Sequence, residues 1–171
     1  MRKITLLIAL FGMIIFQSCT VNDTTTPTNY TDNDTISEVW EYNRSFTATN
    51  NYSNLITFLN PIYSSDMVLV YRLSAIDNGV DVWKQLPESY FFNDGTLDFR
   101  YDFDFTRYDV NIFLDGYALD QLNANVRINQ IFRVVVVPGF FGNKSTMYKD
   151  VDFSNYNDVV AKLGVKTIKK I

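Results

Sequence analysis

Aspartates are the side chains of this sequence whose type and spacing best suit chemistry. Asp98, Asp102 and Asp104 occupy even positions of the segment 96–105, with Arg100 among them. In a strand, neighbouring even positions lie on one face about 6.5–7 Å apart. Carboxylates at that density suit Ca²⁺, which takes about six to eight oxygen ligands, or a glycosidase, whose two carboxyl groups lie about 5–10 Å apart. The alternative, which we favour, is a solvated strand face on which Arg100 partly neutralises its neighbours.

Aromatic side chains are the second group of residues that could form a functional site. Flat rings stack on the faces of sugars, and the rings considered for such a platform are Trp40, Trp83 and Tyr90. The alternative is that these rings fill the core or its rim. Phe140 and Phe141 follow Pro138-Gly139 in an expected loop, where they are candidates for contact with a partner or for packing beneath the loop.

Several function classes are excluded by composition. The 171 residues contain one Cys and no His, so imidazole relays, Cys/His zinc sites and disulfide scaffolds are absent. The sequence has no G-x-G-x-x-G, P-loop, C-x-x-C or G-x-S-x-G motif, and we expect no cofactor and no enzymatic activity. A formal net charge of −4 without any long basic run argues against nucleic acid as a partner.

The only cysteine, Cys19, ends a segment with the character of an export signal. Arg2 and Lys3 precede 13 uncharged residues, 4–16, and Ser18 stands directly before the cysteine. That run is too short to span a bilayer, which takes roughly 20 helical residues. The junction resembles the lipobox of bacterial lipoproteins. The resemblance implies cleavage after residue 18, acylation of Cys19 and a palmitate-type anchor, against the alternative of a plain cleaved signal.

A polar segment follows the cysteine and is expected to be a tether. Residues 20–35 are dominated by Thr, Asn and Asp, which bury too little apolar surface to offset chain entropy. Two triplets, at Thr24 and Thr35, resemble the O-glycosylation sequon of exported Bacteroidota proteins. The neutral Thr20 resembles that of lipoproteins sent to the outer membrane. Whether the domain faces the periplasm or the cell surface is left open, with the periplasm mildly favoured.

From residue 36 onward the dominant hydrophobic period is two, which is typical of strands. The segments expected to be strands are 39–47, 55–59, 67–75, 80–85, 89–92, 96–105, 110–114 and 131–137. Two of them, 67–73 and 131–137, are nearly continuous apolar runs and are expected to be covered on both faces. A short helix capped by Ser154 or Asn155 and ended by Gly164 is expected next, and 165–171 is expected to add an edge strand. The pattern predicts an antiparallel β-sandwich of about seven to nine strands over 36–171.

A family resemblance supports this division of the chain. The blocks DMVLVYRL, VWKQLP, YFFNDG, LDFRYDF, DVNIFLDG and NQIFRVVVVPG occur in this order between residues 66 and 139. This order resembles that of small Bacteroidota lipoproteins, some of which carry collagen-like repeats that are absent here. The resemblance implies no activity and no catalytic residues. Our hypothesis is a lipid-anchored, non-enzymatic binding or envelope-assembly module with a protein or glycan partner. The alternative is a Ca²⁺-dependent glycan-binding protein or a carboxylate-based envelope hydrolase.

Overall fold

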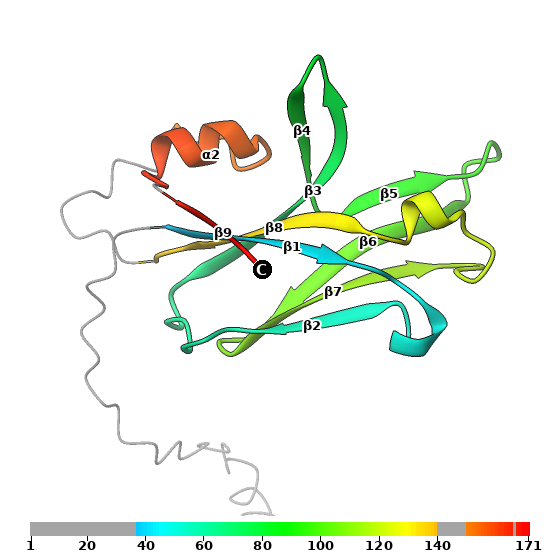
Figure 1. Cartoon of the computed structure of the whole chain (residues 1–171), viewed down its shortest axis with the longest axis horizontal. Helices are drawn as coiled ribbons and strands as arrows, with labels where there is room; N and C mark the ends of the chain where they lie inside the picture. The colour runs from blue at the N-terminus through cyan, green and yellow to red at the C-terminus, as the bar shows by residue number, and fades with distance from the viewer. Residues whose placement is uncertain (1–36, 140–149, 166) are drawn as a thin grey trace, which may run out of the picture. The chain divides into compact units, whose positions relative to one another are not determined.

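The alternating apolar residues of the sequence build two β-sheets that pack face to face (Figure 1). The structure is a computed structural model that describes residues 37–139, 150–165 and 167–171. Within these ranges the chain forms nine strands, one α-helix and two short 3₁₀ turns, η1 (Ala48–Asn50) and η2 (Ala124–Val126). The fold is therefore an all-β sandwich with one short helix near its C-terminal end, as the sequence predicts.

The larger sheet holds the two apolar runs at its centre. Its strands lie in the order β4-β3-β8-β1-β9. Their bounds are β1 (Glu38–Arg44), β3 (Met67–Asp77), β4 (Val80–Gln85), β8 (Gln130–Val137) and β9 (Ile168–Lys170). All neighbours are antiparallel except β1 and β9, which run parallel. The central strands β3 and β8 are covered on both faces, and β9 is the expected edge strand.

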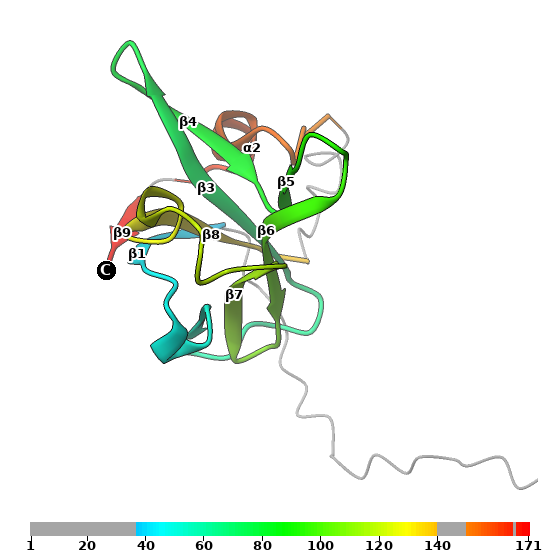
Figure 2. The ribbon, with the colours of Figure 1, turned by 90° about the vertical axis from the view of Figure 1, so that its right-hand side faces the viewer.

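The smaller sheet is purely antiparallel, in the order β2-β7-β6-β5. Its strands are β2 (Ser53–Thr57), β5 (Glu88–Phe91), β6 (Leu97–Phe105) and β7 (Asp109–Gly116). Figure 2, in which the molecule is turned by 90°, shows this sheet and the larger one as separate layers. The alternation in β6 directs Phe99 and Tyr101 into the space between them, and both are buried.

Aromatic rings fill the space between the sheets. Phe46, Tyr101 and Phe132 are all fully buried and meet edge to face, with ring centroids 5.8–6.1 Å apart. Such contacts add about 0.5–1.5 kcal/mol each beyond the area that the rings bury. Because Phe46 is buried in this core and Thr47 is the N-cap of η1, the first strand ends at Arg44 rather than at the predicted residue 47.

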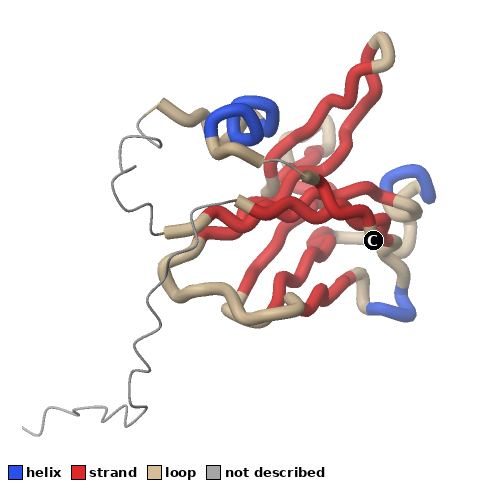
Figure 3. The backbone as a smooth tube through the Cα atoms, turned by 60° about the vertical axis from the view of Figure 1, so that its left-hand side comes forward, coloured by secondary structure: helices blue, strands red, loops and turns tan. Residues whose placement is uncertain are grey.

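The helix α2 (Tyr156–Lys162) forms a third layer on the outer face of the larger sheet (Figure 3). Its N-cap is Asn155, whose side chain accepts hydrogen bonds from the backbone N–H groups of Asn157 and Asp158. A second apolar cluster joins the helix to the sheet and consists of Val39, Leu69, Tyr71, Val135, Val137, Tyr156, Val159 and Leu163. The larger sheet is therefore apolar on both faces, which explains its continuous apolar runs.

The hairpin of β3 and β4 projects beyond the sandwich (Figure 1). Its turn uses Asn78 and Gly79 at φ of 49° and 81°, the left-handed pair that a tight hairpin turn requires. The D-N-G sequence at residues 77–79 is typical of such turns. The hairpin carries Trp83 on β4 out to the level of α2, and this placement forms one wall of the candidate site.

Several predictions fall on residues that the structure does not describe. They concern the signal 1–18, Cys19, the tether with Thr24 and Thr35, and the pair Phe140 and Phe141. In the described part of the chain, no helix combines the length and apolarity that crossing a bilayer demands.

Candidate functional site

A buried arginine organises the outer face of the larger sheet. The side chain of Arg133, on β8, is only 10% exposed. Its Nε and a terminal nitrogen both reach Oε2 of Glu41, at 3.0 and 2.9 Å. A carboxylate oxygen of Asp81 lies 3.9 Å from the same terminal nitrogen. Because an unpaired buried cation is strongly destabilising, the pairing of Arg133 with Glu41 stabilises the fold.

The strand register explains why these charges meet. Arg133 faces Glu41 directly across the pairing of β8 with β1, and Glu41 in turn faces Lys170 across the pairing of β1 with β9. Lys170 Nζ lies 3.0 Å from Oε1 of Glu41. Charged side chains on neighbouring strands therefore form one row across the outer face.

Two aromatic rings cover the arginine. The guanidinium carbon of Arg133 lies 3.9 Å from the ring centroid of Trp83 and 4.8 Å from that of Tyr156. The two rings are 5.4 Å apart. Cation–π contacts of this kind contribute about 0.5–2 kcal/mol, and more as they lose water. The indole of Trp83 is therefore held in one position by a cation beneath it and a ring beside it.

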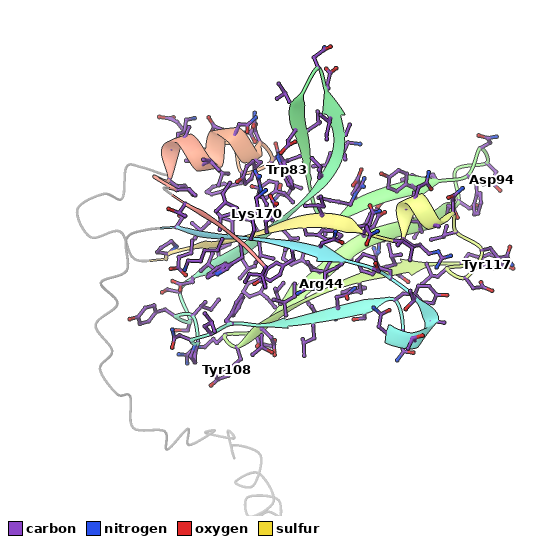
Figure 4. All side chains as sticks on the ribbon, in the orientation of Figure 1. Arg44, Trp83, Asp94, Tyr108, Tyr117 and Lys170 are labelled. Atoms are coloured by element: carbon purple, nitrogen blue, oxygen red, sulfur yellow. The ribbon has the colours of Figure 1, made fainter. Side chains whose placement is uncertain are left out.

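An open cleft lies next to this stack, between β4 and the start of α2. Its volume is about 470 Å³. The residues that line it are Val80, Asp81, Val82, Trp83, Asp152, Ser154, Asn155, Tyr156 and Asn157. Figure 4 shows Trp83 in the region between the β3–β4 hairpin and the helix. The hydroxyl of Tyr71 donates to the carbonyl of Phe153 at 2.5 Å, which fixes the segment before the helix onto the sheet.

The charges at this site are balanced by local contacts. Burial acts to raise the pKa of Glu41, but the hydrogen bonds from Lys170 and Arg133 outweigh it and hold that pKa below its ordinary value. Burial raises the pKa of Tyr156, and the Arg133 cation offsets part of the rise. The buried Tyr156 hydroxyl has no hydrogen-bond partner among the described residues. The cleft thus presents carboxylates and neutral polar side chains. The adjacent cation, Arg133, is already paired with Glu41.

A second buried ion pair lies within the sandwich, between Arg72 and Glu88. Arg72 Nε donates to Oε2 of Glu88 at 2.8 Å, and both side chains are 9% exposed. Another Arg72 nitrogen donates to the hydroxyl of Tyr90 at 2.8 Å, and that hydroxyl donates to Oε1 of Glu88 at 2.8 Å. Gln130 accepts from Arg72 at 3.2 Å. These hydrogen bonds pair the buried charges of Arg72 and Glu88 within the sandwich, so we interpret the network as structural.

The ionisation of the second network follows its geometry. Burial acts to raise the pKa of Glu88, but hydrogen bonds from Arg72 and Tyr90 keep it lower than usual. Burial and the hydrogen bond to Glu88 raise the pKa of Tyr90 to about 12. Tyr90 therefore stays protonated and acts as a hydrogen-bond donor within the sandwich.

The three aspartates considered for Ca²⁺ lie on the outer face of β6, away from the cleft. Arg100 pairs with Asp102 at 3.4 Å and with Asp115 of β7 at 3.0 Å. In the described ranges no three Asp, Glu, Cys or His side chains gather as metal ligands would. The Ca²⁺ site at Asp98, Asp102 and Asp104 stays a prediction, and the ion pairs of Arg100 fit the solvated-face alternative.

The three rings considered as a sugar platform are not brought together. The ring centroids of Trp40 and Phe58 lie 6.2 Å apart, and Trp40 packs against the inner core. Tyr90 stacks on Phe99 within the smaller sheet, with ring centroids 4.5 Å apart. Only Trp83 lines the cleft. A shared platform of all three is therefore not what the structure shows, and a ligand role for Trp83 alone remains a prediction.

The sequence-based search missed Arg133, Glu41 and Tyr156, which form the stack beside the cleft. One signal was available, because an arginine inside an apolar run that is covered on both faces needs a buried partner. Arg133 in IFRVVVV and Arg72 in MVLVYRL both meet that description. In comparisons with protein-family models, curated proteins and solved structures, nothing was found that matches this chain.

Proposed function

We propose that the protein is a lipid-anchored envelope protein whose β-sandwich is a non-enzymatic binding module. Its binding site is the cleft between β4 and α2. The anchor follows from the position of Cys19 after an export-type signal. The binding role rests on one observation, an open cleft of about 470 Å³ beside the fixed Trp83–Arg133 stack. Ligand sites have volumes of roughly 300–1,000 Å³, and this cleft lies within that range.

Rigidity supports binding at this place rather than elsewhere on the surface. Trp83 is held by Arg133 and Tyr156, and the opposite wall is fixed by the bond from Tyr71 to the backbone of Phe153. A site whose side chains are already ordered loses little entropy when a ligand binds. The cleft therefore has the preorganisation that a binding site needs.

The ionisation of the acidic groups favours binding over hydrolysis. A glycosidase needs a carboxylic acid whose pKa is raised so that it can donate a proton near neutral pH. Among the described residues, the carboxyl groups whose pKa values depart from the ordinary range all have lowered values, and they are Glu41, Glu88, Asp94 and Asp158. These groups are anions at neutral pH and suit ion pairing and hydrogen-bond acceptance.

Site-specific photo-crosslinking in living cells tests the proposal. A photoreactive residue at Asn157, in the cleft, is compared with one at Asp104, on the outer face of the smaller sheet. Both positions are exposed. We expect adducts of discrete mass at residue 157 and none of the same mass at residue 104. Equal adducts at both positions, or none at either, would show that the cleft is not the binding site.

The anchor and the membrane face are tested by labelling and by proteolysis. An alkyne analogue of palmitate should label the wild-type protein, and the Cys19→Ser variant should lose the label and leave the envelope fraction. Protease treatment of intact cells, with lysed cells as control, assigns the face. Digestion only after lysis means the periplasm, and digestion on intact cells means the cell surface.

A further inference from the structure

We infer that the cleft binds an uncharged saccharide, with Trp83 and Asp81 on one wall and Asn157 on the other as its contacts. This inference rests on the proposed binding function and adds the chemical class of the ligand. It follows from which hydrogen-bonding groups of the cleft are unused, from the charge around them, and from the small share of apolar surface in the lining.

Several polar groups of the cleft have no protein partner to satisfy them. The carboxylate of Asp81 makes only the 3.9 Å contact with Arg133 and accepts no hydrogen bond within the described residues. The side-chain amide of Asn157 and the indole N–H of Trp83 likewise have no partner there. A carboxylate accepts, an indole donates, and an amide does both. Alternating acceptors and donors of this kind match the hydroxyl groups of a sugar ring.

Charge argues against an anionic ligand. Asp81 and Asp152 both line the cleft. Arg133 lies beneath Trp83 and is already paired with Glu41. Within the described residues, a phosphate, sulfate or uronate group would therefore face two carboxylates and no free cation of the lining, which is unfavourable.

The lining also argues against an apolar ligand. Its aliphatic side chains are Val80 and Val82 on the hairpin, and the remaining positions are polar or aromatic. A polyhydroxyl ligand fits this polar lining. The amino-sugar glycans of the test below distinguish it from a cationic ligand, which Asp81 and Asp152 would attract.

The test uses purified full-length lipoprotein in detergent micelles on an array of neutral, acidic and amino-sugar glycans, followed by calorimetric titration of each hit. We expect binding to neutral glycans. The variants Asp81→Ala and Asn157→Ala remove the hydrogen-bonding groups and should each weaken binding about tenfold or more, the loss of one good hydrogen bond. The matched control Asp104→Ala, on the other sheet, should leave affinity unchanged. Both cleft positions are exposed, so melting temperatures should stay near wild type.

Three outcomes would overturn the inference. They are silence of the neutral glycans, binding confined to acidic or amino-sugar glycans, and neutral binding that neither cleft variant weakens. The crosslinking result separates this failure from that of the binding function. Adducts at residue 157 with a silent array leave a binding module whose ligand is not a neutral glycan. No adducts and a silent array would remove both proposals.

Discussion

Replacing Glu88 by Gln removes the negative charge of the buried ion pair inside the sandwich and keeps the shape of the side chain. Arg72 is then left 9% exposed without a counter-ion, although it retains Gln130, the Tyr90 hydroxyl and the face of the Tyr101 ring at 4.6 Å. Breaking a buried pair by removing one partner costs about 3–5 kcal/mol. Because three other contacts remain, we expect the lower end, about 3 kcal/mol.

The expected loss is large enough to measure by two methods. For a domain of this size it corresponds to a drop of roughly 10–15 °C in melting temperature. Urea unfolding of the mature Cys19→Ser chain gives the free energy of unfolding directly, with an unchanged slope if only stability has changed. The double variant Glu88→Gln/Arg72→Met should recover much of the loss, because it removes both buried charges together.

The control for this prediction is the other partner of Glu88. Lys84 Nζ lies 3.1 Å from Oε1 of Glu88, but its side chain is 57% exposed. Lys84→Ala should therefore cost no more than about 1 kcal/mol. Two results would refute the reasoning. One is a loss below about 1 kcal/mol for Glu88→Gln, and the other is a double variant less stable than either single one.

Three further predictions concern pH, packing and the anchor. The folded pKa values of Glu88 and Glu41 lie below 4.5, so their stabilisation is complete above that pH and is lost as pH falls through the folded values. Urea titrations should show it, and an equally steep slope in Glu88→Gln would contradict it. Gly116→Ala would place a Cβ 2.5 Å from the carbonyl oxygen of Asp98. It should lower the unfolding free energy by about 1–3 kcal/mol, and wild-type stability would refute the close approach. Cys19→Ala should abolish palmitate labelling, and retained label would place the acyl chain elsewhere.

Local sequence pattern was sufficient to predict most of the elements. The alternation in β6 and the D-N-G turn after β3 both act over a few residues, and the structure contains them. Asn155, one of the two caps that the sequence offers for the helix, is the cap that the structure uses. The two apolar runs correctly indicate central strands because burial on both faces removes the alternation.

The candidate site could not be predicted in the same way because its parts come from distant segments. Trp83 and Tyr156 meet only because the β3–β4 hairpin and α2 lie on the same side of the larger sheet. Arg133 meets Glu41 through the pairing of β8 with β1, which short-range pattern does not specify. The aspartates of β6 are conspicuous in the sequence because they lie on an open face. In the structure, Arg100 on that face pairs with Asp102 of β6 and with Asp115 of β7.

Under the proposed N-terminal anchoring, the parallel strand β9 has a mechanical consequence. Tension from the proposed anchor would enter the described domain at β1, in which seven residues pair with β8 and three pair with β9. With β9 in place, β1 has a neighbour on each side, and the backbone N–H of Ile171 also bonds to the carbonyl of Glu41 at 3.0 Å. A load between the proposed anchor and a ligand bound beside β4 would pass across the larger sheet through β8 and β3. Extraction of β1 would then require the hydrogen bonds to β8 and to β9 to break together, whereas an edge strand could peel away from one neighbour.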